Sequence, residues 1–231
     1  MQERAEMQIY PVLTTVQIIV CFINCIVGIR LFKDKNQNIF ERKYIYSFCI
    51  LDLVTGIIIK YYNLTDDSVW YFPLFELIFL FSEIILLPAF ICSTMNLKQN
   101  KIMLILLCII PPIISQLLFN YPTFLSQAIS GIYISIYCIK YLKWLLSTKK
   151  IFPLAQTRHF WIVIGIMICY TATIPSCFTI LLLHSVAKTE LETQFADLII
   201  NFYLILNITM HIFFLKALTC DKVQKSSFSY Q

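Results

Sequence analysis

Apolar residues dominate seven stretches of the chain, and short polar segments separate them. The stretches are each about 19–25 residues long and cover residues 9–31, 44–62, 70–93, 101–119, 122–144, 159–183 and 195–217. A helix needs about 20 apolar residues to cross the hydrocarbon core of a bilayer. Because lipid cannot satisfy open backbone groups, segments of this length must span as helices. The pattern predicts an all-α membrane protein, a bundle of seven transmembrane helices.

Composition supports the same class and leaves no room for a soluble domain. Of the 231 residues, 59% are hydrophobic and 13% charged, with a mean hydropathy of +0.76, whereas soluble domains are about 45–50% apolar and roughly 25% charged. The longest connection, LLSTKKIFPLAQTR at 145–158, is too short to fold alone. We therefore expect residues 1–231 to form a single membrane domain, without a kinase, nuclease or other soluble unit.

The distribution of basic residues predicts the orientation. With the N-terminus outside and the C-terminus cytoplasmic, the outside regions contain only three of the 18 Lys and Arg residues, namely Arg4, Lys60 and Lys188. Lys and Arg concentrate on the cytoplasmic side of membrane proteins, so the opposite orientation is disfavoured. The net charge of +5 is therefore an orientation signal, and we expect no nucleic-acid partner.

Two glutamates lie within the otherwise apolar stretch FELIFLFSEII at 75–85. Glu76 and Glu83 are seven residues apart, which places them on nearly the same helix face, about 10 Å apart along the axis. A charged side chain facing lipid costs at least ~2.5 kcal/mol on insertion scales. We therefore expect this face to point into the bundle.

Other polar residues fall at matching depths in the predicted helices. A rise of about 1.5 Å per residue places one layer roughly 7–11 Å below the outer boundary: Gln17, Glu76, Gln116, Gln127 and Asn201. A second layer lies roughly 16–22 Å deep: Asn24, Asp52, Glu83, Asn207 and His211. A short turn joins the second and third segments, so Asp52 and Glu83 are expected to lie close together and could share a proton. His211 could pair with either acid.

These residues admit a functional and a structural interpretation. Intramembrane ionisable residues commonly mark ligand or proton sites, and we select as candidates Asp52, Glu76, Glu83, Asn201, Asn207 and His211. Polar residues can also hold helices together through interhelical hydrogen bonds of about 0.6–2 kcal/mol. For Gln17, Asn24, Gln116 and Gln127 taken singly, this structural interpretation is favoured.

Specific chemistries are not indicated. No H-E-x-x-H, G-x-S-x-G or P-loop pattern occurs, so an enzyme is disfavoured but stays an open alternative, and we expect no cofactor and no metal site. None of the nine cysteines falls in an outer loop, which argues against disulfides. Cys21 and Cys25 lie four residues apart on one helix face, and small packing residues are favoured there over a metal or thiol role. Proline removes a backbone donor, so helix breaks are expected at four positions: Pro88, Pro111, Pro112 and Pro175.

Four segments carry a resemblance to a known group of proteins. They read FPLFELIFLFSEII, PTFLSQAISGIYISIYCIKYL, PLAQTRHFWIVIGIMICYTATIPSCF and DLIINFYLILNIT. In their order, with an acid in the third helix and a Phe160-Trp161 pair opening the sixth, the chain resembles uncharacterised seven-helix proteins of Bacteroidetes-type bacteria. The resemblance implies a bacterial inner-membrane protein, a sensory module that works with a separate signalling protein. It assigns no role to any residue.

Three functional hypotheses follow. The first is a sensory or signal-transducing module without its own output domain, which binds a ligand or proton in a polar intramembrane pocket and passes the change to a cytoplasmic signalling protein at loops 30–43 and 140–158. The second is a small secondary transporter, since buried acids and proline-interrupted helices suit that class. The third is an intramembrane lipid-modifying enzyme that uses the carboxylates as acid and base.

Overall fold

The computed structural model describes residues 12–26, 39–65, 72–119, 124–147, 157–186 and 190–220. Within these ranges the chain is helical and contains no strand. The helices are an N-terminal helix, Val12–Ile26, followed by α2 (Ile39–Thr65), α3 (Phe72–Thr94), α4 (Lys101–Phe119), α5 (Phe124–Ser147), α6 (Arg158–Val186) and α7 (Glu190–Thr219). Each predicted apolar stretch corresponds to one of them, which confirms the all-α fold with seven helices.

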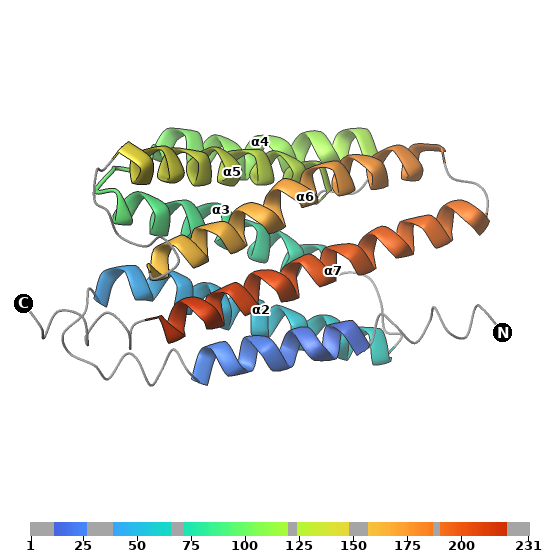
Figure 1. Cartoon of the computed structure of the whole chain (residues 1–231). Helices are drawn as coiled ribbons and strands as arrows, with labels where there is room; N and C mark the ends of the chain where they lie inside the picture. Colours follow the sequence, from blue (N-terminus) through green and yellow to red (C-terminus); the bar gives the residue numbers. More distant parts are fainter. Residues whose placement is uncertain are drawn as a thin grey trace, which may run out of the picture.

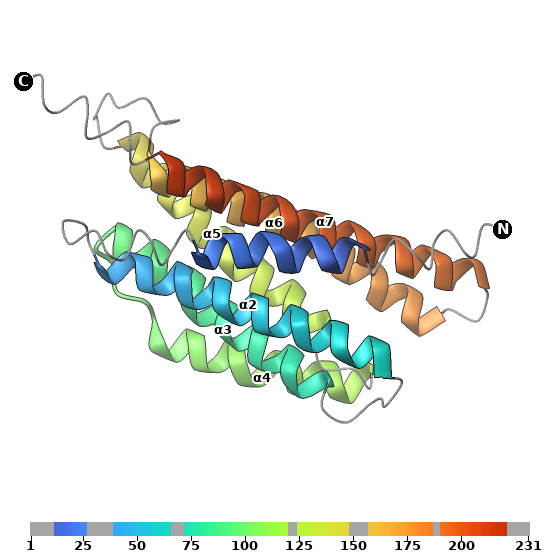
Figure 2. The same cartoon turned by 90° about the horizontal axis from the view of Figure 1, so that it is seen from below.

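Consecutive helices run antiparallel and form an elongated bundle (Figure 1). α6 packs mainly against α5 and α7, while α2 packs mainly against α3. The N-terminal helix lies along α2 and α7 on one side of the bundle, as the view from below shows (Figure 2). The first helix is therefore placed to contact two helices that are far apart in the sequence.

Five of the described helices, α3 to α7, are long and apolar enough to cross a membrane. The outward face of α4 is apolar, as a surface in contact with lipid is expected to be. Ile102, Ile105, Ile109, Ile113 and Leu117 repeat at helical spacing and are all more than half exposed. Contiguous apolar surface on this scale is rare on soluble monomers. The chain is a multi-pass membrane protein. The N-terminal helix and α2 are not among the five, so the count of seven crossings stays a prediction.

The turn between α3 and α4 illustrates how local sequence ends one helix and begins the next. Asn96 has a φ of 55°, the left-handed conformation that Asn tolerates better than most residues. The Leu97 N–H donates to the Cys92 carbonyl at 2.8 Å, the six-residue closure of a Schellman cap. The Asn100 side-chain oxygen then accepts from the N–H groups of the second and third residues of α4, at 3.1 and 3.2 Å, as an N-cap does.

The expected helix breaks at proline are wrong. The helices continue through all four positions: Pro88 in α3, Pro111 and Pro112 in α4, and Pro175 in α6. At Pro88 the missing N–H leaves the Ile84 carbonyl without its usual donor, and the Gln99 side chain donates to that carbonyl at 3.5 Å. Neighbouring side chains that satisfy freed backbone groups make such prolines tolerable in membrane helices.

Candidate functional site

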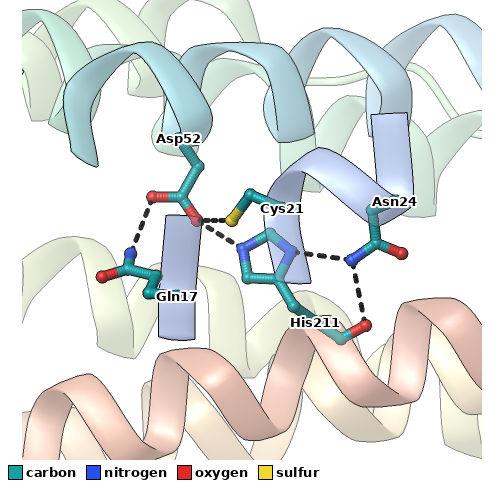
Figure 3. A network of polar contacts seen from close by, with 5 residues as sticks. All are labelled: Gln17, Cys21, Asn24, Asp52 and His211. Carbon is teal, nitrogen blue, oxygen red and sulfur yellow. Dashed lines mark hydrogen bonds and ion pairs between the residues drawn. The ribbon is translucent and has the colours of Figure 1, made fainter. Parts of the chain in front are cut away.

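Asp52 is the centre of a buried polar network that joins three helices. Gln17 Nε2 donates to its Oδ1 at 3.2 Å, and the Cys21 thiol donates to its Oδ2 at 3.4 Å. His211 Nε2, on α7, contacts the same Oδ2. Figure 3 shows these side chains converging from the N-terminal helix, α2 and α7. Together with Asn24, they form what we call the polar node: Gln17, Cys21, Asn24, Asp52 and His211.

Asn24 and Asp52 together determine which nitrogen of the His211 ring carries the proton. Asn24 Nδ2 donates to the His211 backbone carbonyl at 3.1 Å and lies 3.2 Å from the ring Nδ1. An amide nitrogen offers only donors, so Nδ1 must be the acceptor. In the neutral ring the proton therefore sits on Nε2 and is donated to Asp52. The geometry thus assigns His211 one tautomer.

Apolar packing excludes water from the node and fixes the imidazole. The side chains of His211 and Asp52 are 0% and 3% exposed. The Phe48 ring stacks on the imidazole at 6.1 Å with an interplanar angle of 10°, and the Phe214 ring meets it edge-on at 5.5 Å. Hydrogen bonds are stronger in such a low dielectric, and a polar group left unpaired there is costly. Breaking one contact of the polar node is therefore expected to destabilise the folded protein strongly.

The sequence of the N-terminal helix explains how three of these side chains reach the node. Thr14, Gln17, Cys21 and Asn24 follow the spacing 3, 4, 3, which aligns them on one helix face, and all four are buried. The helix also approaches α2 closely at Gly56, because a Cβ built there would lie 3.2 Å from the Ile18 side chain. The polar face of the N-terminal helix and the close approach to α2 at Gly56 thus position the polar node.

Glu83 lies outside this network. The proton expected to be shared between Asp52 and Glu83 therefore has no hydrogen bond to carry it in the described structure. Glu83 is buried, and neither carboxyl oxygen has a hydrogen-bond partner among the described residues. The Tyr170 hydroxyl lies near its carboxyl group and Asp52 acts on it electrostatically, yet no hydrogen bond of standard geometry joins the hydroxyl to the carboxyl group in the described structure. Of the two acids, His211 pairs with Asp52. Glu83 is a second buried polar point, on α3.

The structure separates the other candidates. Asn207 is buried and Asn201 partly buried, and the Oδ1 of each has no hydrogen-bond partner in the described part of the chain. The side chain of Glu76 lies outside the described residues. Gln127 donates to the Tyr203 hydroxyl at 2.8 Å, as interhelical glue does, whereas Gln116 is exposed.

The two predicted depth layers are bridged at Gln17. The prediction assigns this residue to the outer layer, and its side chain bonds directly to Asp52 of the deeper one. A depth counted along one helix ignores how far that helix is shifted relative to its neighbour. Only the packed structure supplies that shift.

Sequence reasoning missed Cys21 as a site residue and expected no metal site. The ligand atoms of Cys21, Asp52 and His211 lie within 4.8 Å of one another, and all three residues are buried. Thiolate, carboxylate and imidazole are the donor types that zinc and related transition metals use. The polar stripe on the first helix, read with the deep acid and histidine, was the signal that could have revealed the cluster.

Comparison with protein-family models, with curated proteins and with solved structures finds no match to this chain. The resemblance to seven-helix bacterial proteins therefore stays a prediction. The polar node and Glu83 are the features of the described structure that indicate a function.

Proposed function

We propose that the chain is a sensory or signal-transducing membrane protein. The observation that supports this most is the buried Asp52–His211 contact between α2 and α7. Apolar membrane helices need no such pair in order to pack. Binding of a ligand or proton at this buried polar contact can change how the two helices, which are distant in sequence, are arranged.

The packing of the bundle allows the Asp52–His211 contact to act as a switch between two helix arrangements. α2 packs mainly against α3, and α7 against α6, so the node connects two groups of helices through side chains and through the N-terminal helix. A ligand that binds Asp52 or His211 differently in two arrangements shifts the equilibrium between them. Helix movements of 1–2 Å at such interfaces are a common form of signal transmission.

A distance measurement between α2 and α7 tests the proposal. Spin labels would be attached through noncanonical amino acids at Lys43 and Lys216, which are exposed near the helix ends, because the native cysteines preclude thiol labelling. We expect Asp52→Asn to shift or broaden the distance distribution measured by pulsed electron resonance in nanodiscs. Gln127→Leu, which removes a polar contact elsewhere, is the control and should leave the distribution unchanged. An unchanged distribution in folded Asp52→Asn would count against a switch.

We further propose seven crossings in a bacterial inner membrane, with the N-terminus outside and the C-terminus cytoplasmic. The support is the distribution of Lys and Arg and the match between the seven apolar stretches and the seven helices. Fusions at the C-terminus discriminate between the orientations. A green fluorescent protein fusion should fluoresce and an alkaline phosphatase fusion should be inactive. The reverse pattern would overturn the orientation.

The output would pass to a cytoplasmic signalling protein at loops 30–43 and 140–158. Much of both loops lies outside the described residues, but Lys43, Lys140 and Lys143 are exposed at the adjoining helix ends. Purification of the tagged protein from its native membrane in mild detergent, followed by mass spectrometry, tests this. A stoichiometric soluble kinase or regulator would support the proposal, while a chain that purifies alone would oppose it.

Glu83 favours a second candidate function, a small proton-coupled transporter. Its buried carboxyl group has no hydrogen-bond partner among the described residues. An ionised carboxylate in that position would be a costly unpaired charge, so we expect it to hold a proton that a conformational change could release. Proton uptake coupled to a substrate in proteoliposomes, abolished by Glu83→Gln, would support transport over sensing.

A further inference from the structure

We propose that Cys21, Asp52 and His211 bind a divalent transition-metal ion of the Zn²⁺ class. The inference rests on the proposed function in treating this ion as the ligand that acts on the polar node. The three residues come from the N-terminal helix, α2 and α7 respectively (Figure 3). One ion would therefore bind three helices at once, which no pairwise hydrogen bond in the node achieves.

The spacing of the ligand atoms is close to that of a zinc site. With Zn–S near 2.3 Å and Zn–N or Zn–O near 2.0 Å, neighbouring ligand atoms of a tetrahedron are about 3.3–3.6 Å apart. Cys21 Sγ and Asp52 Oδ2 are 3.4 Å apart, and all three ligand atoms lie within 4.8 Å of one another. The direct contact between His211 and Asp52 has to open to admit the ion. The ion would thus replace the hydrogen bond that closes the node.

Charge balance selects a divalent ion. Cys21 as thiolate and Asp52 as carboxylate supply two negative charges, and His211 is neutral, so a 2+ ion makes the buried site neutral. An uncompensated charge at this depth would be costly. The mixed sulfur, nitrogen and oxygen donors disfavour Mg²⁺ and Ca²⁺, which prefer oxygen alone. Binding releases the thiol proton of Cys21, and the ring proton of His211 moves from Nε2 to Nδ1.

The surroundings supply a second shell of ligand-orienting groups. Gln17 holds the Asp52 oxygen that faces away from the ion. Asn24 lies 3.2 Å from Nδ1 of the imidazole, and its Oδ1 is buried with no hydrogen-bond partner among the described residues. Once Nδ1 carries the proton, a rotation of the Asn24 side chain that turns Oδ1 toward Nδ1 lets that oxygen accept the hydrogen bond, at the cost of the present bond from Nδ2 to the His211 carbonyl. Metal-bound histidines almost always donate their second nitrogen to such an acceptor.

Three protein ligands leave the fourth position of a tetrahedral ion open. Zinc sites with three protein ligands hold water or another ligand in the fourth position, whereas purely structural sites are closed by four protein ligands. Reversible binding of the ion would suit a sensor because occupancy can follow the ion concentration. Cys25 provides the matched control, since it is buried one turn from Cys21 and is not one of the three clustered ligands.

The test uses the full chain in lipid nanodiscs after treatment with a chelator. Zn²⁺ binding is measured by equilibrium dialysis with mass-spectrometric counting, and Co²⁺ is added separately as a spectroscopic probe. We expect one ion per chain and a thiolate-to-cobalt absorption band. Cys21→Ser should abolish the band and weaken Zn²⁺ binding at least tenfold, as should Asp52→Asn, while Cys25→Ser should retain both.

The outcomes separate this inference from the proposed function. Failure of the wild-type protein to bind either ion, or equal binding by Cys21→Ser and the wild type, would overturn the metal site while leaving the α2–α7 distance experiment intact. Binding of Zn²⁺ at Cys21 that leaves the spin-label distances unchanged would uphold the metal site and contradict its role in sensing.

Discussion

Asp52 on α2 and His211 on α7 are separated by 159 positions in the sequence, yet their side chains meet within the buried interior of the helix bundle. The contact is enclosed by Phe48 and Phe214 and is extended by donors from the N-terminal helix. Because both partners are polar and buried, removing either one leaves the other unpaired and lowers the stability of the folded protein. Four predictions follow from this arrangement and from the packing around it.

The Asp52–His211 pair should behave as a strongly coupled unit. Removing one partner of a buried pair leaves the other uncompensated and typically costs about 3–5 kcal/mol. We expect His211→Leu to destabilise the protein by about 3 kcal/mol, near the lower end because Gln17 and Cys21 still donate to Asp52. Asp52→Leu should cost at least as much, because it leaves His211, Gln17 and Cys21 all without their acceptor. The double variant should cost far less than the sum. Reversible unfolding in mixed micelles measures this cycle, and additive costs would show that the two residues act independently.

Gly165 allows α6 and α7 to approach closely. A Cβ at this position would lie 2.7 Å from Phe213 Cβ and 3.3 Å from the Met210 carbonyl oxygen. Gly165→Ala should therefore destabilise the protein by about 1–3 kcal/mol, because overpacking forces the helices apart. Gly56→Ala is the milder comparison, since its Cβ meets only the movable Ile18 side chain at 3.2 Å. Equal unfolding midpoints for the two variants would contradict the close α6–α7 contact.

Two glutamines should respond oppositely to the same substitution. Gln127 donates to the Tyr203 hydroxyl at 2.8 Å, so Gln127→Leu should lose about 0.6–2 kcal/mol of interhelical hydrogen bonding. Gln116 is exposed on α4, and Gln116→Leu should be neutral or slightly stabilising in a bilayer. Thermal unfolding of both variants in nanodiscs compares them. A greater loss for Gln116→Leu would mean that the outward direction assigned to that residue is wrong.

The sequence was sufficient to predict the seven helices, because a long apolar stretch in lipid has few alternatives to a helix. For α4 the predicted range and the observed bounds coincide at residues 101–119. Asp52 and His211 could be selected as candidates for the same reason: an acid and a histidine deep in an apolar helix need partners. The choice of His211 for Asp52 over Glu83 could not be predicted, because it depends on which helices are neighbours.

The role of the N-terminal helix was also beyond the sequence argument. Taken one at a time, Gln17 and Asn24 resemble ordinary interhelical glue, and Cys21 resembles a small packing residue. Their shared face becomes informative only when α2 and α7 are known to lie against it. Side-chain direction along a helix can be read from spacing, whereas the identity and axial shift of the opposing helix are properties of the packed bundle.

Nitrogen-15 NMR of the protein labelled at histidine is the measurement that tests the polar node most directly. The chain has three histidines, so His211→Gln assigns the signal. In chelator-treated nanodiscs, we expect His211 to be neutral, with a protonated Nε2 and an unprotonated Nδ1 that accepts from Asn24. Asn24→Leu should remove the hydrogen bond to Nδ1 and shift the Nδ1 resonance while Nε2 stays protonated against Asp52, and the control Cys25→Ser should leave both resonances unchanged. A protonated Nδ1 in the wild type, or a ring proton in rapid exchange with water, would contradict the buried contact that ties α2 to α7.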